Sequence, residues 1–219
     1  MKKTIYFLVA SLLFAACGQS PEEKAKKLVE ESVKKSLYHP ESYEPVEVIL
    51  DSAFAPKDDP AVYEKAVRLY ELSKSGQEYE DNMKDAKSSM AIWSDSYMSS
   101  YSKNRYNEAK EKFEYYSEKV EENTAKIQKT FNEMAKLAEP GRRFIGFKVS
   151  HKFRAKNNNG DVLMGNYVYL VDESVTNILA EYDSDSEEYK MVQALFQALA
   201  EKAEEELEEL ENGGGDIGE

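Results

Sequence analysis

The chain has 219 residues, of which 42 are acidic and 29 basic, so its formal net charge at pH 7 is −13. This charge argues against nucleic acid as a partner and against direct adhesion to an anionic membrane surface, because both need a basic footprint. A hydrophobic content of 41%, with 15 tyrosines and 9 phenylalanines, excludes a disordered composition and supplies an ordinary core.

The first 17 residues have the pattern of a secretory signal. Lys2 and Lys3 precede an apolar run over 5–13, and small residues lead directly to Cys17. The run is shorter than the roughly 18–20 residues that span a bilayer. A cysteine in this place resembles a bacterial lipobox, although Phe14 stands where leucine is commoner. The resemblance implies a signal peptide over 1–16, diacylation of the Cys17 sulfur with chains such as palmitate, and a membrane-anchored protein.

Two alternatives to lipidation remain, a plain signal peptide with a stray thiol and a short membrane anchor. Cys17 is the only cysteine, so no disulfide can form within the chain. In lipoproteins of the Bacteroidota, an acidic cluster soon after the cysteine resembles an export signal for the cell surface, and Glu22 and Glu23 fit it. The same residues also suit a helix start, since carboxylates favour the positive end of the helix dipole.

The segment after the signal predicts a helix and then a strand. A helix over 21–37 carries apolar residues at every fourth position and ends before Pro40, which disfavours helical geometry in the residue that precedes it. Alternating apolar residues then predict a strand over 43–54.

Residues 59–139 predict a long helical hairpin. Asp59 and Pro60 are a favourable helix start, and apolar residues recur at four-three spacing from Tyr79 to Met134, which is typical of a coiled coil. We expect interruptions at Gly76 and around 99–104. The polar residues Asn123 and Thr130 fall on the seam and are expected to fix its register.

After the hairpin the periodicity changes to two. It predicts a strand over 143–156, an Asn-Gly turn over 157–160 and a returning strand over 162–172. Ser184 and Glu187 predict a capping box for the last helix.

The fold class expected is α+β and predominantly helical. An N-terminal helix packs on a three-stranded antiparallel sheet, the helical hairpin is inserted between strands 1 and 2, and a helix closes the chain. The expected segments are a signal peptide (1–16), a lipidated tether (17–22), a small α+β core (23–58 and 140–182), the hairpin insertion (59–139), a C-terminal helix (183–212) and a flexible tail (213–219).

The segments that frame the hairpin resemble a group of small bacterial lipoprotein and secreted domains of unknown function. The resemblance rests on Leu37-Tyr38-His39-Pro40-Glu41-Ser42-Tyr43, and on a hairpin with Val149, Phe153, Ala155, Asn157 and Gly160 followed by Tyr167-Val168-Tyr169. It covers about 80 residues, none of them in the insertion, and implies a fold and an envelope location without any catalytic residue.

Two clusters could bind a ligand. Lys148, Lys152, Arg154 and Lys156 share one strand face, where acidic helices of the same molecule would pair with them, or where an acidic peptide, a glycan acid or a phosphate would bind. Tyr97, Tyr101 and Tyr106 lie near the turn of the hairpin among Ser and Asn residues, a composition found in recognition loops. Packing in the helix seam is the alternative for Tyr97 and Tyr106.

No residue pattern points to a reaction or to a cofactor. His39 and His151 are the only histidines, and neither has the neighbours that a zinc site needs, so we expect no metal. The sequence therefore predicts a non-enzymatic lipoprotein of the cell envelope, in the outer membrane, that acts as a protein-interaction or scaffold module. The alternative is a ligand-binding lipoprotein that captures a glycan or peptide through the tyrosine-rich tip or the basic strand face. A ligand binder would line a pocket with those tyrosines, whereas a scaffold would bury them in the seam.

Overall fold

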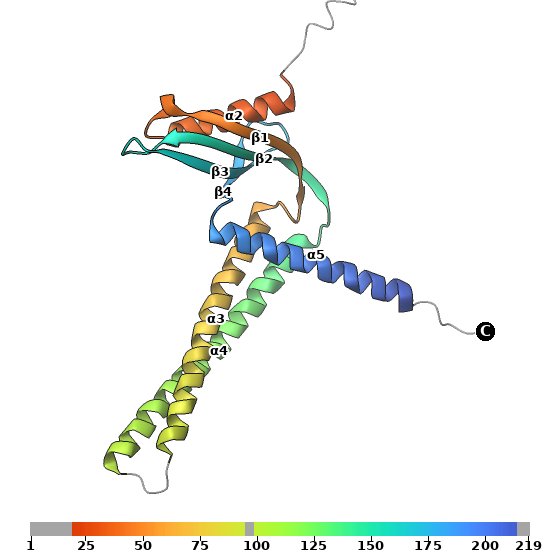
Figure 1. Ribbon diagram of the computed structural model, residues 1–219. Coiled ribbons are helices and arrows are strands. Elements are labelled where there is room, and N and C mark those ends of the chain that lie inside the picture. Colours follow the sequence, from red (N-terminus) through yellow and green to blue (C-terminus); the bar gives the residue numbers. More distant parts are fainter. Residues whose placement is uncertain (1–18, 95–98, 214–219) are drawn as a thin grey trace, which may run out of the picture. The chain divides into compact units, whose positions relative to one another are not determined.

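The computed structural model of the protein describes residues 19–94 and 99–213 (Figure 1). Within these residues it contains four α-helices and a four-stranded antiparallel sheet, so the predicted α+β class is confirmed. The chain forms two units, one built from 1–54 with 144–185 and the other from 55–143 with 186–219. Cys17 and the predicted signal peptide lie outside the described residues, as does Tyr97.

The first unit begins with α2 (Pro21–Ser36) and a short 3₁₀ helix η2 (Pro40–Ser42). Ser20 caps α2 with a capping box: its hydroxyl accepts a hydrogen bond from the Glu23 backbone, and the Glu23 carboxylate accepts one from the Ser20 backbone. Ala25, Val29 and Val33, one helical turn apart, are buried. The predicted apolar stripe is therefore the face that packs on the sheet.

The sheet has the order β1 (Glu44–Ala55), β2 (Arg143–Lys156), β3 (Val162–Val171) and β4 (Ile178–Asp183). The prediction of three strands was wrong because it missed β4. This strand has six residues and pairs with β3 from Tyr167↔Asp183 to Val171↔Ile178. Its side chains alternate between half-buried and exposed, but the exposed positions include Leu179 as well as Glu181 and Asp183. The apolar residues therefore do not alternate along the sequence, and so short a segment is easily taken for a loop.

A single apolar core lies between α2 and the sheet. On β2 the odd positions Val149, His151, Phe153 and Ala155 are buried, which confirms the predicted alternation. Tyr169 and Val171 of β3 complete the layer. Each large apolar side chain buried here contributes about 1.5–3 kcal/mol, so this contact stabilises the unit.

His151 is a hydrogen-bonded core residue, 1% exposed. Its Nδ1 lies 3.2 Å from the Glu47 carbonyl, which can only accept, so Nδ1 carries the proton and Nε2 accepts from the Tyr43 hydroxyl at 2.9 Å. Burial lowers the pKa of His151, and burial together with Glu30 raises the pKa of Tyr43 to about 12. Both ring nitrogens are occupied in the neutral state.

The second unit contains α3 (Pro60–Trp93), α4 (Ser100–Ala138) and α5 (Glu187–Gly213). Figure 1 shows α3 and α4 side by side as an antiparallel pair. The Lys65 ammonium lies 2.8 Å from the Glu133 carboxylate of the facing helix. The ring centroids of Tyr63 and Tyr189 are 6.3 Å apart, so α5 packs against the first turns of α3.

The interruption predicted at Gly76 was wrong, because α3 runs through this residue. The interruption predicted around 99–104 lies a few residues earlier, since α3 ends at Trp93 and α4 starts at Ser100 with Ser99 as its cap. Gly76 is needed for the close approach of Asn123, because a Cβ on it would lie 2.6 Å from the Asn123 Nδ2 atom. That buried amide donates a hydrogen bond to the Leu72 carbonyl at 2.9 Å.

Asn123 therefore lies at the seam and links the two helices, as predicted. Thr130 is also buried, but its hydroxyl donates to the Lys126 carbonyl of its own helix and does not fix the register. The predicted capping box at Ser184 was wrong as well: Ser186 caps the start of α5 by accepting from the Tyr189 backbone, and Ser184 donates to the Asn166 carbonyl.

Candidate functional site

The predicted basic face lies on the side of β2 opposite α2. Lys152, Arg154 and Lys156, which we call the basic strand patch, are paired through the backbone with Asn166, Met164 and Val162 of β3. Among the described residues, no carboxylate lies within 4.0 Å of their charged groups. The expected ion pairs with acidic helices are therefore not formed by these three residues. Lys148 is half-buried nearer the middle of the strand and makes interactions of its own.

The predicted tyrosines separate in the structure. Tyr101, in the first turn of α4, is 59% exposed, whereas Tyr106 is half-buried. Tyr97 lies outside the described residues. The scaffold expectation that these residues fill the seam thus fails for Tyr101.

Tyr101 belongs to a group at the free end of the hairpin that we call the hairpin-end cluster, with Trp93 and Arg105. The Trp93 and Tyr101 rings meet edge to face with centroids 5.8 Å apart. Arg105 lies over the Tyr101 ring at 5.4 Å, and its Nε donates to the Tyr101 hydroxyl at 3.2 Å. Glu108 holds the other side of the same guanidinium at 3.2 Å. These contacts fix the Arg105 side chain.

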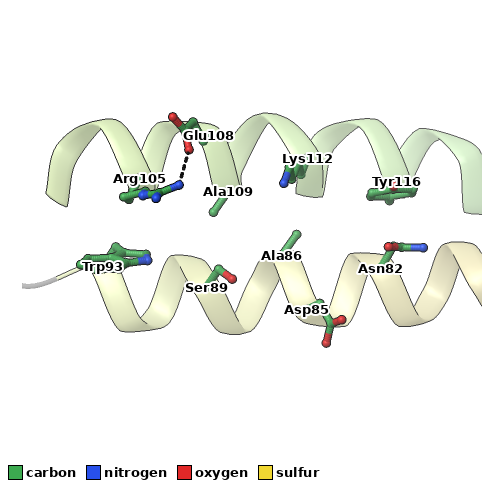
Figure 2. Close-up of a pocket in the computed structure, with 10 residues that line it drawn as sticks. All are labelled: Asn82, Asp85, Ala86, Ser89, Trp93, Arg105, Glu108, Ala109, Lys112 and Tyr116. Carbon is green, nitrogen blue, oxygen red and sulfur yellow. Dashed lines mark hydrogen bonds and ion pairs between the residues drawn. The ribbon is translucent and has the colours of Figure 1, made fainter. Parts of the chain in front are cut away.

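Next to this cluster is a cleft of ≈ 320 Å³ between α3 and α4, which we call the seam cleft (Figure 2). Ala86 and Ala109, each 5% exposed, face one another across its base. The side chains that line it are Asn82, Ser89 and Trp93 from α3, and Arg105, Lys112 and Tyr116 from α4. Asp85 and Glu108 also line it; in Figure 2 the Asp85 carboxylate points away from α4, and one carboxylate oxygen of Glu108 is turned toward Arg105.

The cleft follows from the helical spacing of the sequence. At 100° per residue, positions 82, 89 and 93 fall on one flank of Ala86, and positions 79, 83 and 90 fall on the other. The same offsets from Ala109 place 105, 112 and 116 on one flank and 106 and 113 on the other. One flank of the seam therefore carries Met and Tyr or Phe, and the other carries polar and charged groups between two aromatic rings.

Sequence reasoning followed the apolar flank and so missed Asn82, Ser89, Lys112 and the role of Arg105. The signal was the repeated spacing 82, 86, 89, 93 on one helix and 105, 109, 112, 116 on the other. Both series place an alanine among polar residues and end on an aromatic residue.

Several general features bear on function. Among the described residues, no three His, Cys, Asp or Glu side chains are gathered as a metal site would require. Within the same residues, no helix is both long and apolar enough to cross a membrane. Comparisons of the chain with protein-family models, with curated proteins and with solved structures gave no match.

Proposed function

We propose that this protein is a non-enzymatic, lipid-anchored protein of the cell envelope whose helical hairpin binds a partner protein with its free end. The observation that supports this is the hairpin-end cluster, where Trp93, Tyr101 and Arg105 are held together on the surface. Tryptophan, tyrosine and arginine are the residue types that dominate binding energy at protein interfaces.

The cluster is also prepared for binding. The guanidinium of Arg105 contacts both Tyr101 and Glu108, so part of its rotamer freedom is already restricted before a partner binds. Ile92, 71% exposed on the last turn of α3, adds apolar surface beside Trp93. A rigid aromatic and arginine surface with an adjacent exposed aliphatic residue would serve as the centre of an interface.

The two helices of the hairpin are long. Its helices of 34 and 39 residues extend about 50 Å and about 58 Å at 1.5 Å per residue. Near the N-terminus, Ser20 caps α2 and lies three residues after Cys17. A lipid on that cysteine would therefore hold the first unit within about 10 Å of its anchor point.

A pull-down from native envelope tests the proposal. The mature chain from Cys17 is the bait, and Tyr101→Ala and Arg105→Ala are compared with Tyr115→Ala, a 54% exposed tyrosine of the same helix. We expect a discrete partner that is lost with the first two variants and retained with the third. Equal recovery with all three baits would contradict binding at the hairpin end.

A second candidate function is capture of an acidic peptide on the basic strand patch. The unpaired cations Lys152 and Arg154 support it, together with Val162 and Met164, which are exposed on the same face of β3. Binding of a Glu- and Leu-containing peptide that weakens with Lys152→Gln but is unchanged by Lys35→Gln, an exposed lysine in the last turn of α2, would favour this function.

A further inference from the structure

We infer that the seam cleft binds a neutral sugar ring, a role that goes beyond protein binding by the hairpin end. The cleft is concave and lies within one unit, between helices that pack along their lengths. Its volume of ≈ 320 Å³ is at the lower end of the range of about 300–1,000 Å³ seen for small-molecule pockets. The space suits one or two rings.

Aromatic rings stand at both ends of the cleft. Trp93 closes the end near the tip of the hairpin and Tyr116 closes the other (Figure 2). Each ring is held by a second aromatic side chain: Trp93 by Tyr101, and Tyr116 by Tyr115 at a centroid distance of 5.1 Å. A sugar presents an apolar C–H face as well as hydroxyls, and covering that face with an aromatic ring removes apolar surface from water.

The polar groups between the rings have free hydrogen-bonding capacity. The Asn82 amide nitrogen donates to the Glu78 carbonyl at 2.8 Å, which leaves the amide oxygen as an acceptor. Of the residues that the structure describes, none forms a hydrogen bond or ion pair with the side chains of Ser89 or Lys112. The cleft thus offers an acceptor, a hydroxyl and an ammonium group with three donors.

The charge balance favours a neutral ligand. Arg105 is already paired with Glu108 at 3.2 Å, and Asp85 and Lys112 carry opposite charges on the same opening, so a net charge on the ligand gains little. An anion would also meet the repulsion of a chain with net charge −13. Hydroxyl groups both donate and accept, so a ring with several hydroxyls can satisfy donors and acceptors together.

The protein carries its own probe for this site. Trp93 is the only tryptophan in the chain, so tryptophan emission reports on one wall of the cleft. We would titrate the mature chain with glucose, galactose, mannose and N-acetylglucosamine, and with glucuronate as the charged comparison. The inference predicts a saturable change in emission with at least one neutral sugar, and weaker binding of glucuronate.

Variants assign the binding to the cleft. Lys112→Gln should weaken sugar binding about tenfold, which is the loss of affinity expected for one hydrogen bond from a charged donor. Lys110→Gln should not, because Lys110 faces Glu114 at 3.7 Å on the exposed surface of the same helix. Ser89→Leu, which fills the cleft, should abolish binding while the circular dichroism at 222 nm stays unchanged.

No saturable response to any neutral sugar would overturn the inference, as would tighter binding of glucuronate or equal loss with Lys110→Gln and Lys112→Gln. The outcome can be separated from the proposed protein binding. Ser89→Leu should leave capture of a protein partner intact, and failure of the pull-down does not alter the titration.

Discussion

The contact between Gly76 and Asn123 predicts how the substitution Gly76→Ala changes stability. The gain in helix propensity opposes the loss of the buried Asn123 hydrogen bond, and the larger of the two decides the sign. Replacing Gly76 by alanine in the middle of a helix normally stabilises it by about 1 kcal/mol. Here the new Cβ would lie 2.6 Å from the Asn123 Nδ2 atom, so the amide must move away from the Leu72 carbonyl. Asn123 is 5% exposed, and leaving its amide unsatisfied costs about 1–3 kcal/mol.

The effect of Gly76→Ala on the free energy of unfolding should change sign when Asn123 is also replaced. Gly76→Ala in the natural chain should lower the free energy of unfolding by about 1 kcal/mol, since loss of the buried hydrogen bond exceeds the gain in helix propensity. In an Asn123→Ala background the clash is absent, and the same substitution should raise it by about 1 kcal/mol. The coupling energy between the two positions is therefore about 2 kcal/mol.

Urea denaturation followed by Trp93 emission measures this cycle within the hairpin unit, because Trp93 is its only tryptophan. Circular dichroism of each variant before denaturation checks that the helices are intact. If Gly76→Ala stabilised the natural chain as much as it stabilised the Asn123→Ala variant, the assignment of Asn123 to the seam contact would be refuted.

Three further predictions concern the first unit and the anchor. Burial lowers the pKa of His151, so its contribution to stability is present above the unfolded value of about 6.5 and is lost as the pH falls through the lower folded value. The protection factors of the β2 amides, which correct for the slower intrinsic exchange at lower pH, should therefore decrease below about pH 6.5, and protection factors that stay constant would count against this prediction. The Asp172 carboxylate accepts hydrogen bonds from the Thr176 and Asn177 backbone, which lowers its pKa. Asp172→Ala should therefore lower the free energy of unfolding by roughly 1–2 kcal/mol. Glu173→Ala in the same loop is the control and should leave thermal unfolding nearly unchanged. Cys17→Ala should abolish metabolic labelling with palmitate and release the protein from the membrane fraction; labelling that persists would contradict lipidation.

The parts of the fold that sequence could predict are those where one element carries the whole signal. The alternation of β2 could be predicted because Val149, Phe153 and Ala155 pack on a single helix and the other face is basic. The seam position of Asn123 could be predicted because a polar residue there interrupts an apolar repeat. Both signals come from residues within one continuous element.

The missed features depend on segments far apart in the sequence. Strand β4 is stabilised by pairing with β3 and by a loop in which the Asp172 carboxylate gathers backbone and side-chain donors, so its own residues look like a connection. The seam cleft exists because Ala86 meets Ala109 across the hairpin, which brings the polar flanks of α3 and α4 to the same opening. Neither helix alone indicates a site.

The central claim is that the free end of the hairpin binds a partner protein, and photo-crosslinking in the native envelope tests it most directly. A photoreactive phenylalanine analogue would replace Tyr101 in the full chain, and the same analogue at Tyr115 would serve as the control, since the two side chains are 59% and 54% exposed on one helix. The account predicts a discrete crosslinked species at position 101 that is absent at position 115 and disappears when Arg105→Ala is added. A species of equal yield at both positions, or none at position 101, would contradict it.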